Sequence, residues 1–273
     1  MAGYISKAGH DVTVYNRTGT KADKWVAEFK GSKADTPAKA AESAEFVFTC
    51  VGNDNDLREV TFGDNGIFKT VKKGAIYVDN TTASATIARE IYDHSLKNEF
   101  GFLDAPVSGG QAGAENGALT VMIGGDQVNF DKAKDIIDCY SKKMKLLGGA
   151  GNGQLAKMVN QICIAGLVQG LSEAINFGVK SGLNMVDVIE VISKGAAQSW
   201  QMENRYKTML DDKFEHGFAV DWMRKDLKIA LDEAKKNGSL LPITEIVDQY
   251  YAEIQEMGGS RWDTSSLIKR LSK

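Results

Sequence analysis

The sequence predicts two domains, an amino-terminal α/β domain built on a doubly wound parallel sheet and an all-helical carboxyl-terminal domain. As far as residue 147, segments rich in β-branched and aromatic residues alternate with amphipathic helical segments, which is typical of strands joined by helices. Several of these strand segments are apolar throughout, as expected where helices cover both faces of a sheet. After Gly153 only helical patterns follow, so we place the domains at 1–150 and 151–273.

The amino-terminal domain begins in an unusual way. Residues 1–8 have the pattern of a helix that ends at Gly9, where a left-handed glycine is favoured, and a strand is expected at 11–15. A doubly wound nucleotide-binding domain normally starts with a strand and a glycine-rich turn that binds a pyrophosphate. Neither precedes the strand at 11–15, so we expect the chain to be truncated at its amino terminus.

The other elements of this domain follow in alternation. A helix is expected at 21–29, and Thr36-Pro37 supplies a cap and an N1 proline for the next one. Further strands are expected at 46–51, 75–78, 102–105, 119–124 and 145–147, with helices that begin near 53 and 84 and a last helix at 126–143.

A glycine-rich turn at 149–153 leads into a long helix at about 154–181, which joins the two domains. The helix would span roughly 42 Å at 1.5 Å per residue, and it is apolar on nearly all sides, so we expect it to be buried along most of its length. The turn fits the G-x-G-x-x-A form of a dinucleotide fingerprint, but no strand follows the helix. We therefore interpret the glycines as a sharp turn between domains. Further helices are expected at 184–193, 200–210, 218–237, 242–257 and 265–271.

Composition excludes several classes of protein. The formal net charge is −3 and the basic residues are scattered, so we expect neither a nucleic-acid nor a membrane partner. The three cysteines are widely spaced, which favours a reducing cytoplasm over a disulfide framework. The three histidines are isolated, and no cluster has the spacing of metal ligands.

The residues after the second expected strand indicate the cofactor. An acid at this place binds the ribose 2′-hydroxyl of NAD, whereas an arginine accommodates the 2′-phosphate of NADP. Here the chain has Asn16, Arg17 and Thr18 and no acid. Because a guanidinium can pair bidentately with a phosphate, we expect NADP(H), with NAD(H) as the alternative. Outside this position, a solvated arginine would be the simpler interpretation.

Two more polar segments follow apolar strands at their carboxyl ends, where open parallel sheets bind ligands. One contains Val51, Gly52 and Asn53, and the other contains Thr81. Small and polar residues let the backbone approach a ribose or nicotinamide. The same residues also cap helices, so contact with the cofactor and simple capping are equal alternatives here.

A candidate for anion binding follows the strand at 102–105. Ser108, Gly109 and Gly110 can offer a hydroxyl and backbone N–H groups to a small anion such as a carboxylate. The alternative is a tight turn without a ligand. No histidine lies near Ser108 in the sequence to activate it as a nucleophile.

Lys157 is the candidate for proton transfer. It lies in the first turns of the long helix, and Asn160 and Gln161 follow three and four residues later, on the same helix face. A lysine held in a dry cleft can have a pKa well below its usual value, which suits it to proton transfer near neutral pH. The alternative is a lysine that reaches solvent from the start of the helix.

Four stretches in this order resemble the β-hydroxyacid dehydrogenase family, which includes 3-hydroxyisobutyrate dehydrogenases, tartronate semialdehyde reductases and glyoxylate/succinic semialdehyde reductases. The resemblance covers the whole chain. It rests on residues 1–5, which resemble the end of the amino-terminal signature of the family, on the segment 104–110, on the Gly-x-Gly-x-x-x-Lys pattern at 151–157, and on the segment 218–226. It implies a Rossmann-like sheet plus a helical domain.

The resemblance also implies roles. Lys157 would be the general acid/base, and Ser108, Gly109 and Gly110 would bind the substrate carboxylate. Relatives place an asparagine four residues after the lysine; here Gln161 holds that position and Asn160 precedes it, so either amide is a candidate for orienting the substrate. Residues near the nicotinamide and the pocket would be Lys225, Asp226 and Phe218.

The leading hypothesis is therefore hydride transfer between NADP(H) and a small β-hydroxy acid or semialdehyde acid. The resemblance implies a homodimer or homotetramer formed through the helical domain. The alternatives are a relative of 6-phosphogluconate dehydrogenase, an imine reductase-like enzyme, a scaffold without activity, or an inactive fragment. The identity of the substrate does not follow from the sequence.

Overall fold

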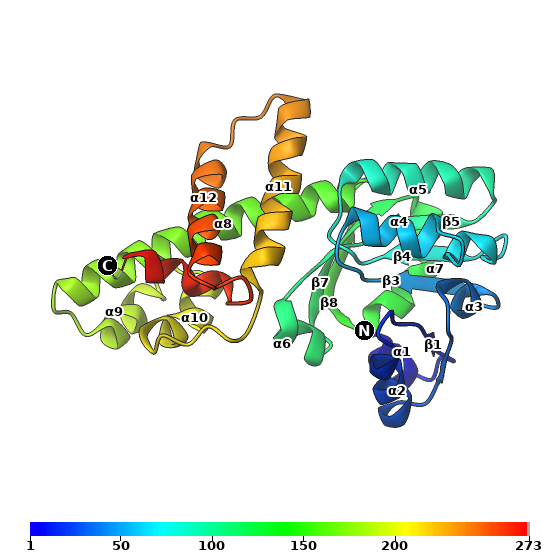
Figure 1. Cartoon of the computed structure of the whole chain (residues 1–273), viewed down its shortest axis with the longest axis horizontal. Helices are drawn as coiled ribbons and strands as arrows, with labels where there is room; N and C mark the ends of the chain where they lie inside the picture. Colours follow the sequence, from blue (N-terminus) through cyan, green and yellow to red (C-terminus); the bar gives the residue numbers. More distant parts are fainter. Residues whose placement is uncertain (272–273) are drawn as a thin grey trace. The chain divides into compact units, whose positions relative to one another are not determined.

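The computed structural model describes residues 1–271. The chain divides into two compact units, Met1–Lys157 and Met158–Lys273, and the division falls within helix α8 (Asn152–Lys180). The first unit is α/β and the second is helical (Figure 1).

The first unit contains a six-stranded mixed sheet. Its strands are β3 (Phe46–Thr49), β4 (Ile76–Asp79), β5 (Gly101–Asp104), β7 (Leu119–Gly125), β6 (Val107–Ser108) and β8 (Ser141–Leu146). The neighbours β3, β4 and β5 are parallel, but β7 is antiparallel to both β5 and β6, and β8 pairs with β7 in parallel. The expectation of a doubly wound parallel sheet is therefore confirmed for β3, β4 and β5, and it is wrong where β7 pairs with β5 and β6.

Two shorter strands lie outside this sheet. The strand expected at 11–15 is reduced to β1 (Thr13–Val14), which pairs in parallel with β2 (Ser32–Lys33), a strand that the sequence pattern did not predict. The chain enters β1 from helix α1 (Ala2–Lys7), and Gly9 has the left-handed φ of 97° that the sequence led us to expect.

Side chains alternate between the two faces of the large sheet, and both faces are covered. On one face Val78 and Leu103 pack with Ile137 of α7 (Gln127–Asp138). On the other face Tyr77 and Phe102 pack with residues of α4 (Asp54–Phe62) and α5 (Ala85–Lys97). Strands that are buried on both sides need apolar residues at successive positions, which explains the apolar runs in the sequence.

The other helices of the first unit are short or capped locally. They are α2 (Gly19–Glu28), α3 (Pro37–Ala41), the 3₁₀ helix η1 (Ile67–Lys69) and α6 (Gly110–Glu115). Thr36 caps α3 by accepting a hydrogen bond from the backbone N–H of Lys39, as the Thr-Pro pair predicted. The last helix was expected to run to 143, but α7 ends at Asp138 and β8 begins at Ser141.

The second unit is helical, and its described residues, 158–271, form no strand. After α8 come α9 (Met185–Ile192), α10 (Trp200–Leu210), α11 (Val220–Asn237) and α12 (Pro242–Glu256), and the segment expected as a last helix is the 3₁₀ helix η2 (Thr264–Leu271). Helices α11 and α12 lie side by side in opposite directions (Figure 1). They pack with Ala165 and Val168 of α8 around the buried Tyr251.

Helix α8 is less buried than expected. Its apolar window has a mean hydropathy of 1.4, but only 39% of that window is buried. Among the described residues it is the one helix whose length and composition would allow it to cross a membrane, a test that core helices of water-soluble proteins also pass. The exposed part is one face, because the exposed residues recur every three or four positions.

Candidate active site

The loop proposed to bind a carboxylate lies between β6 and α6. Ser108 pairs with Thr120 of β7, and Gly109 and Gly110 have positive φ angles of 133° and 61°. Side chains with a Cβ are strained at such angles, so both positions favour glycine. Ser108 is half-buried, and its hydroxyl makes no hydrogen bond with any residue in the range 1–271. The loop therefore presents a hydroxyl that is available to a ligand.

The start of α8 is fixed by a residue that sequence reasoning did not single out. The fully buried carboxylate of Asp104, at the end of β5, accepts hydrogen bonds from the backbone N–H groups of Gly151 (2.7 Å) and Gln154 (2.9 Å). Burial raises the pKa of this carboxyl, and these backbone donors oppose the rise. No sequence spacing could have indicated this contact, since the partners lie 47 and 50 residues apart.

Lys157 lies one turn further along α8 and is only 6% exposed. A lysine that reached bulk solvent from the start of the helix would be far more exposed, so that alternative does not describe this side chain. The turn before it carries Gln154, which is also buried.

A chain of polar contacts occupies the beginning of the second unit. The Nδ2 of Asn160 donates to the Oε1 of Gln161 (2.8 Å), and the Nε2 of Gln161 donates to the Oδ2 of Asp226 (2.7 Å). The Nζ of Lys225 lies 2.8 Å from the other oxygen of Asp226. Thus the structure brings together four of the residues that the sequence singled out.

This chain distinguishes the two candidate amides. A carboxylate only accepts hydrogen bonds, so Gln161 must direct its NH₂ group at Asp226 and its oxygen at Asn160. Gln161 is 2% exposed and both ends of its amide are engaged. Asn160 is half-buried, and no residue among 1–271 donates to its Oδ1. Asn160 therefore keeps a free acceptor, whereas Gln161 is a link in the chain.

Phe218 lies in the segment before α11 and packs partly against the core of the second unit. Its backbone N–H donates to the buried carboxylate of Asp263 (2.8 Å), and the Nε of Arg205 lies 3.2 Å from the other oxygen of Asp263. Asp263, which the sequence did not indicate, therefore holds this segment in place.

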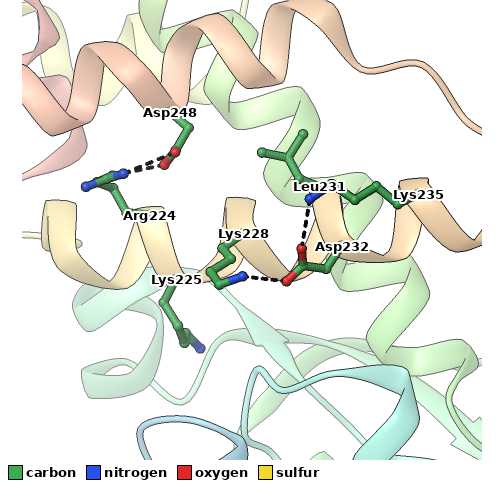
Figure 2. Close-up of a pocket in the computed structure, with 7 residues that line it drawn as sticks. All are labelled: Arg224, Lys225, Lys228, Leu231, Asp232, Lys235 and Asp248. Carbon is green, nitrogen blue, oxygen red and sulfur yellow. Dashed lines mark hydrogen bonds and ion pairs between the residues drawn. The ribbon is translucent and has the colours of Figure 1, made fainter.

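Lys225 lines a pocket of about 430 Å³ on α11 (Figure 2). Arg224 leaves the helix on the opposite side and pairs with Asp248 at 3.0 Å. Lys228 and Lys235 both pair with Asp232. The lining carries four basic side chains and two carboxylates, so its net charge is positive.

The residues proposed to contact the cofactor form two groups in the first unit. The Oδ1 of Asn16 accepts from the backbone N–H of Thr18, which shapes the turn, and the side chain of Arg17 is 84% exposed and pairs with Asp56 at 3.1 Å. Asp56 also accepts from Asn53, whose own Oδ1 caps α4. The arginine is therefore accessible, and an unexpected acid lies beside it.

The second group joins the loops after β3 and β4. The backbone N–H of Val51 donates to the hydroxyl of the buried Thr81 (3.0 Å), and the half-buried Gly52 follows it. The Thr49 hydroxyl, at the end of β3, donates to the Oδ1 of Asp79, at the end of β4 (2.7 Å). The Oδ2 of Asp79 is buried and accepts no hydrogen bond from the described part of the chain. Burial raises the pKa of this carboxyl to about 7.

Similarity to known proteins covers both units. Residues 1–149 match the family described as the NAD binding domain of 6-phosphogluconate dehydrogenase. Residues 151–271 match the family described as NAD-binding of NADP-dependent 3-hydroxyisobutyrate dehydrogenase.

Individual relatives agree with these families. An uncharacterized oxidoreductase of Shewanella frigidimarina is 63% identical over 100% of this chain and 94% of its own. The 2-hydroxy-3-oxopropionate reductase of Escherichia coli is 34% identical over 99% of this chain and 92% of its own. The structure of 3-hydroxyisobutyrate dehydrogenase from Mycobacterium tuberculosis with L-serine has a TM-score of 0.89 and 25% identity, and the match covers 100% of this chain and 94% of that one.

The resemblance drawn from the four sequence stretches is confirmed. The chain belongs to the 3-hydroxyisobutyrate dehydrogenase family and is an NAD(P)-dependent oxidoreductase of the 3-hydroxyacid dehydrogenase type.

Proposed function

We propose that this protein transfers a hydride between NADP(H) and a small β-hydroxy acid or semialdehyde acid, with Lys157 as the general acid/base. The observation that carries the proposal is the burial of Lys157, 6% exposed, at the catalytic-lysine position of the motif. A buried amine close to a reacting oxygen can exchange a proton with it as charge develops there.

Each of the site residues has one role in the proposed reaction. When bound, the nicotinamide would supply the hydride in reduction and accept it in oxidation. In reduction the Nζ of Lys157 gives a proton to the carbonyl oxygen, which becomes the hydroxyl; in oxidation the same nitrogen takes that proton back. The Ser108 hydroxyl and the glycine backbone beside it bind the substrate carboxylate. The side-chain amide of Asn160, whose Oδ1 accepts from no described residue, orients the substrate, and Phe218 lines the pocket.

The chemistry of the exposed groups fits the cofactor. Arg17 would have to give up its ion pair with Asp56 in order to bind a 2′-phosphate. A surface ion pair of this kind is worth only ~1 kcal/mol or less, so the exchange would cost little. The Val51–Thr81 contact and Gly52 would hold backbone near the ribose, and Lys225 would lie beside the nicotinamide with Asp226 as its counter-charge. NAD(H) is the alternative cofactor.

We also propose that the protein is a cytoplasmic homodimer or homotetramer that associates through its helical unit. The exposed face of α8 carries Val159, Cys163, Leu167, Gly170, Ala174 and Phe177, all apolar, at spacings of three and four. An apolar stripe of this kind favours coverage by a second copy. Leu240, 90% exposed, adds to the apolar surface of the same unit.

The test is a panel of substrates assayed with NADPH and with NADH. The panel contains succinic semialdehyde, tartronate semialdehyde, glyoxylate and 3-hydroxyisobutyrate. We expect turnover of at least one of them, with a higher kcat/KM for NADPH. The positive pocket at Lys225 and Lys228 favours a phosphorylated hydroxy acid as the second candidate, so 6-phosphogluconate is included. A cyclic imine is the last member, and turnover of the imine alone would contradict the proposal.

A further inference from the structure

The carboxylate of Asp104 caps a helix that lacks a cap of its own. Helix α8 begins at Asn152 after Gly151, a residue without a side chain that could accept from the first turn. The Asn152 side chain is turned to the backbone oxygen of Leu147 instead. The first-turn N–H groups of a helix need acceptors, and one oxygen of Asp104 accepts from Gln154 in that turn while the other accepts from Gly151 just before it. A negative charge also suits the positive end of a helix dipole.

Close backbone packing makes this junction rigid. A Cβ at Gly153 would lie 2.6 Å from the backbone oxygens of Asp104 and Met122, and a Cβ at Gly124 would lie 2.5 Å from the carboxylate of Asp104. The ends of β5 and β7 therefore touch the start of α8 without side chains between them. Interiors packed this closely resist small displacements.

Gln154 makes a second attachment, to the loop after β4. Its Oε1 accepts from the backbone N–H of Ala83 (3.0 Å), and its Nε2 donates to the backbone oxygen of Thr81 (2.8 Å). Both ends of the amide are thus engaged, and Gln154 is 1% exposed. The loop that it grips contains Thr81, which is also bonded to Val51.

We propose that Asp104 and Gln154 are positioning residues for the reaction: they fasten the start of α8 to the carboxyl ends of β4 and β5 and so fix where Lys157 lies. The inference rests on the proposed role of Lys157, which follows Gln154 by three residues, or nearly one helical turn. Neither residue needs to touch the substrate. A misplacement of ~1 Å can cost about 100-fold in rate, so a loosened junction would be visible in turnover.

The variants are Asp104→Asn, Asp104→Ala and Gln154→Met, with Ile137→Val as the matched control. Ile137 is buried in the same unit, on α7, and its change removes one methylene from the core. Amide hydrogen exchange at Gly151 and Gln154 reports the cap independently of activity. We expect faster exchange there in both Asp104 variants and unchanged exchange in the control.

Kinetics are measured with the substrate of the panel that gives the highest kcat. We expect kcat to fall by about 100-fold in Asp104→Ala and by less in Asp104→Asn, because asparagine keeps one acceptor oxygen. The KM for the cofactor and the KM for the substrate should each stay within about twofold of the wild-type values. Gln154→Met should lower kcat in the same way, and it keeps the test decisive if the Asp104 variants do not fold. A loss confined to the KM for the hydroxy acid would overturn the proposal, because it would place the effect in the Ser108 loop that Asp104 precedes.

A double variant separates this proposal from the one on which it rests. In a Lys157→Ala background, Asp104→Asn should cause no further loss of the residual rate, because the residue it positions is gone. Independent, multiplying losses would overturn the positioning role alone. Near-normal turnover of the single variant Lys157→Ala would overturn both the proposed function and the positioning role. Faster amide exchange with an unchanged kcat in Asp104→Asn would overturn only the positioning role.

Discussion

The buried carboxyl of Asp79 makes the stability of the protein depend on pH. This carboxyl is completely buried at the end of β4, one oxygen accepts hydrogen bonds from Thr49 and Thr81, and the other accepts none from residues 1–271. Desolvation is the main cause that raises its pKa from 3.8 to about 7, and the hydrogen bonds from Thr81 and Thr49 lower it. The folded protein therefore binds this proton more tightly than the unfolded chain.

The sign and size of the effect follow from linkage. Below about pH 4 the carboxyl is protonated in both states and costs nothing, whereas above about pH 7 folding must bury a charge, so stability falls as the pH rises between these values. The shift from 3.8 to about 7 corresponds to roughly 4 kcal/mol at 1.36 kcal/mol per pH unit, as an order of magnitude. An asparagine resembles the protonated acid and should remove most of this cost.

Thermal unfolding at pH 4.5, 6 and 8 measures the effect. Asp79→Asn should melt close to the wild type at pH 4.5 and above it at pH 8, by up to roughly 8–16 °C for a stabilisation of ~4 kcal/mol. Asp131→Asn, an exposed change on α7, is the matched control and should leave the pH dependence unaltered. The reasoning is refuted if Asp79→Asn is the less stable protein at pH 8.

Three further predictions concern the cofactor, the amide chain and association. Arg17→Ala should lower kcat/KM for NADPH by about tenfold with little change in kcat/KM for NADH. Asp56→Asn should raise kcat/KM for NADPH, because the arginine loses a competing partner. An unchanged ratio of the NADPH and NADH values in both variants would contradict the role of Arg17. Gln161→Met removes the amide donor to the buried Oδ2 of Asp226, while Lys225 stays beside the other oxygen, and should lower the melting temperature by several degrees, since a lost bond to a buried charge costs ~1.5–3 kcal/mol; an unshifted melting temperature would count against this chain of contacts. Phe177→Glu should shift the mass measured by light scattering towards the monomer, and an unchanged mass would rule out this face.

Strands that are buried on both faces could be predicted from the sequence, and short or edge strands could not. The runs that contain Val47, Tyr77 and Phe102 are apolar because both sides of each strand are covered. β2 and β6 have two residues each, too few to show a period. From Lys143 on, β8 alternates lysine with apolar residues. Its first residues continue the amphipathic pattern of α7, so the sequence predicts helix where β8 begins. The antiparallel direction of β7 leaves no trace in composition.

The candidate site was predictable where its residues lie together in sequence. Gly151 and Lys157 form a local motif, as do Ser108 and the two glycines after it. Asp104 and Asp263 act instead on backbone N–H groups 45 or more residues away, and such contacts have no local spacing. The sequence also could not show which of the two amides, Asn160 or Gln161, is engaged by other side chains, since only the contact with Asp226 orients the glutamine amide.

The most direct test of the central claim is the kcat of Lys157→Ala with NADPH and the best substrate of the panel, compared with Lys180→Ala, a change at the exposed end of the same helix. A general acid/base contributes about 100- to 10,000-fold, so kcat of the Lys157 variant should fall by that amount while its melting temperature and NADPH affinity stay near the wild type. The Lys180 variant should keep its rate. A kcat within twofold of the wild type in Lys157→Ala would contradict the account.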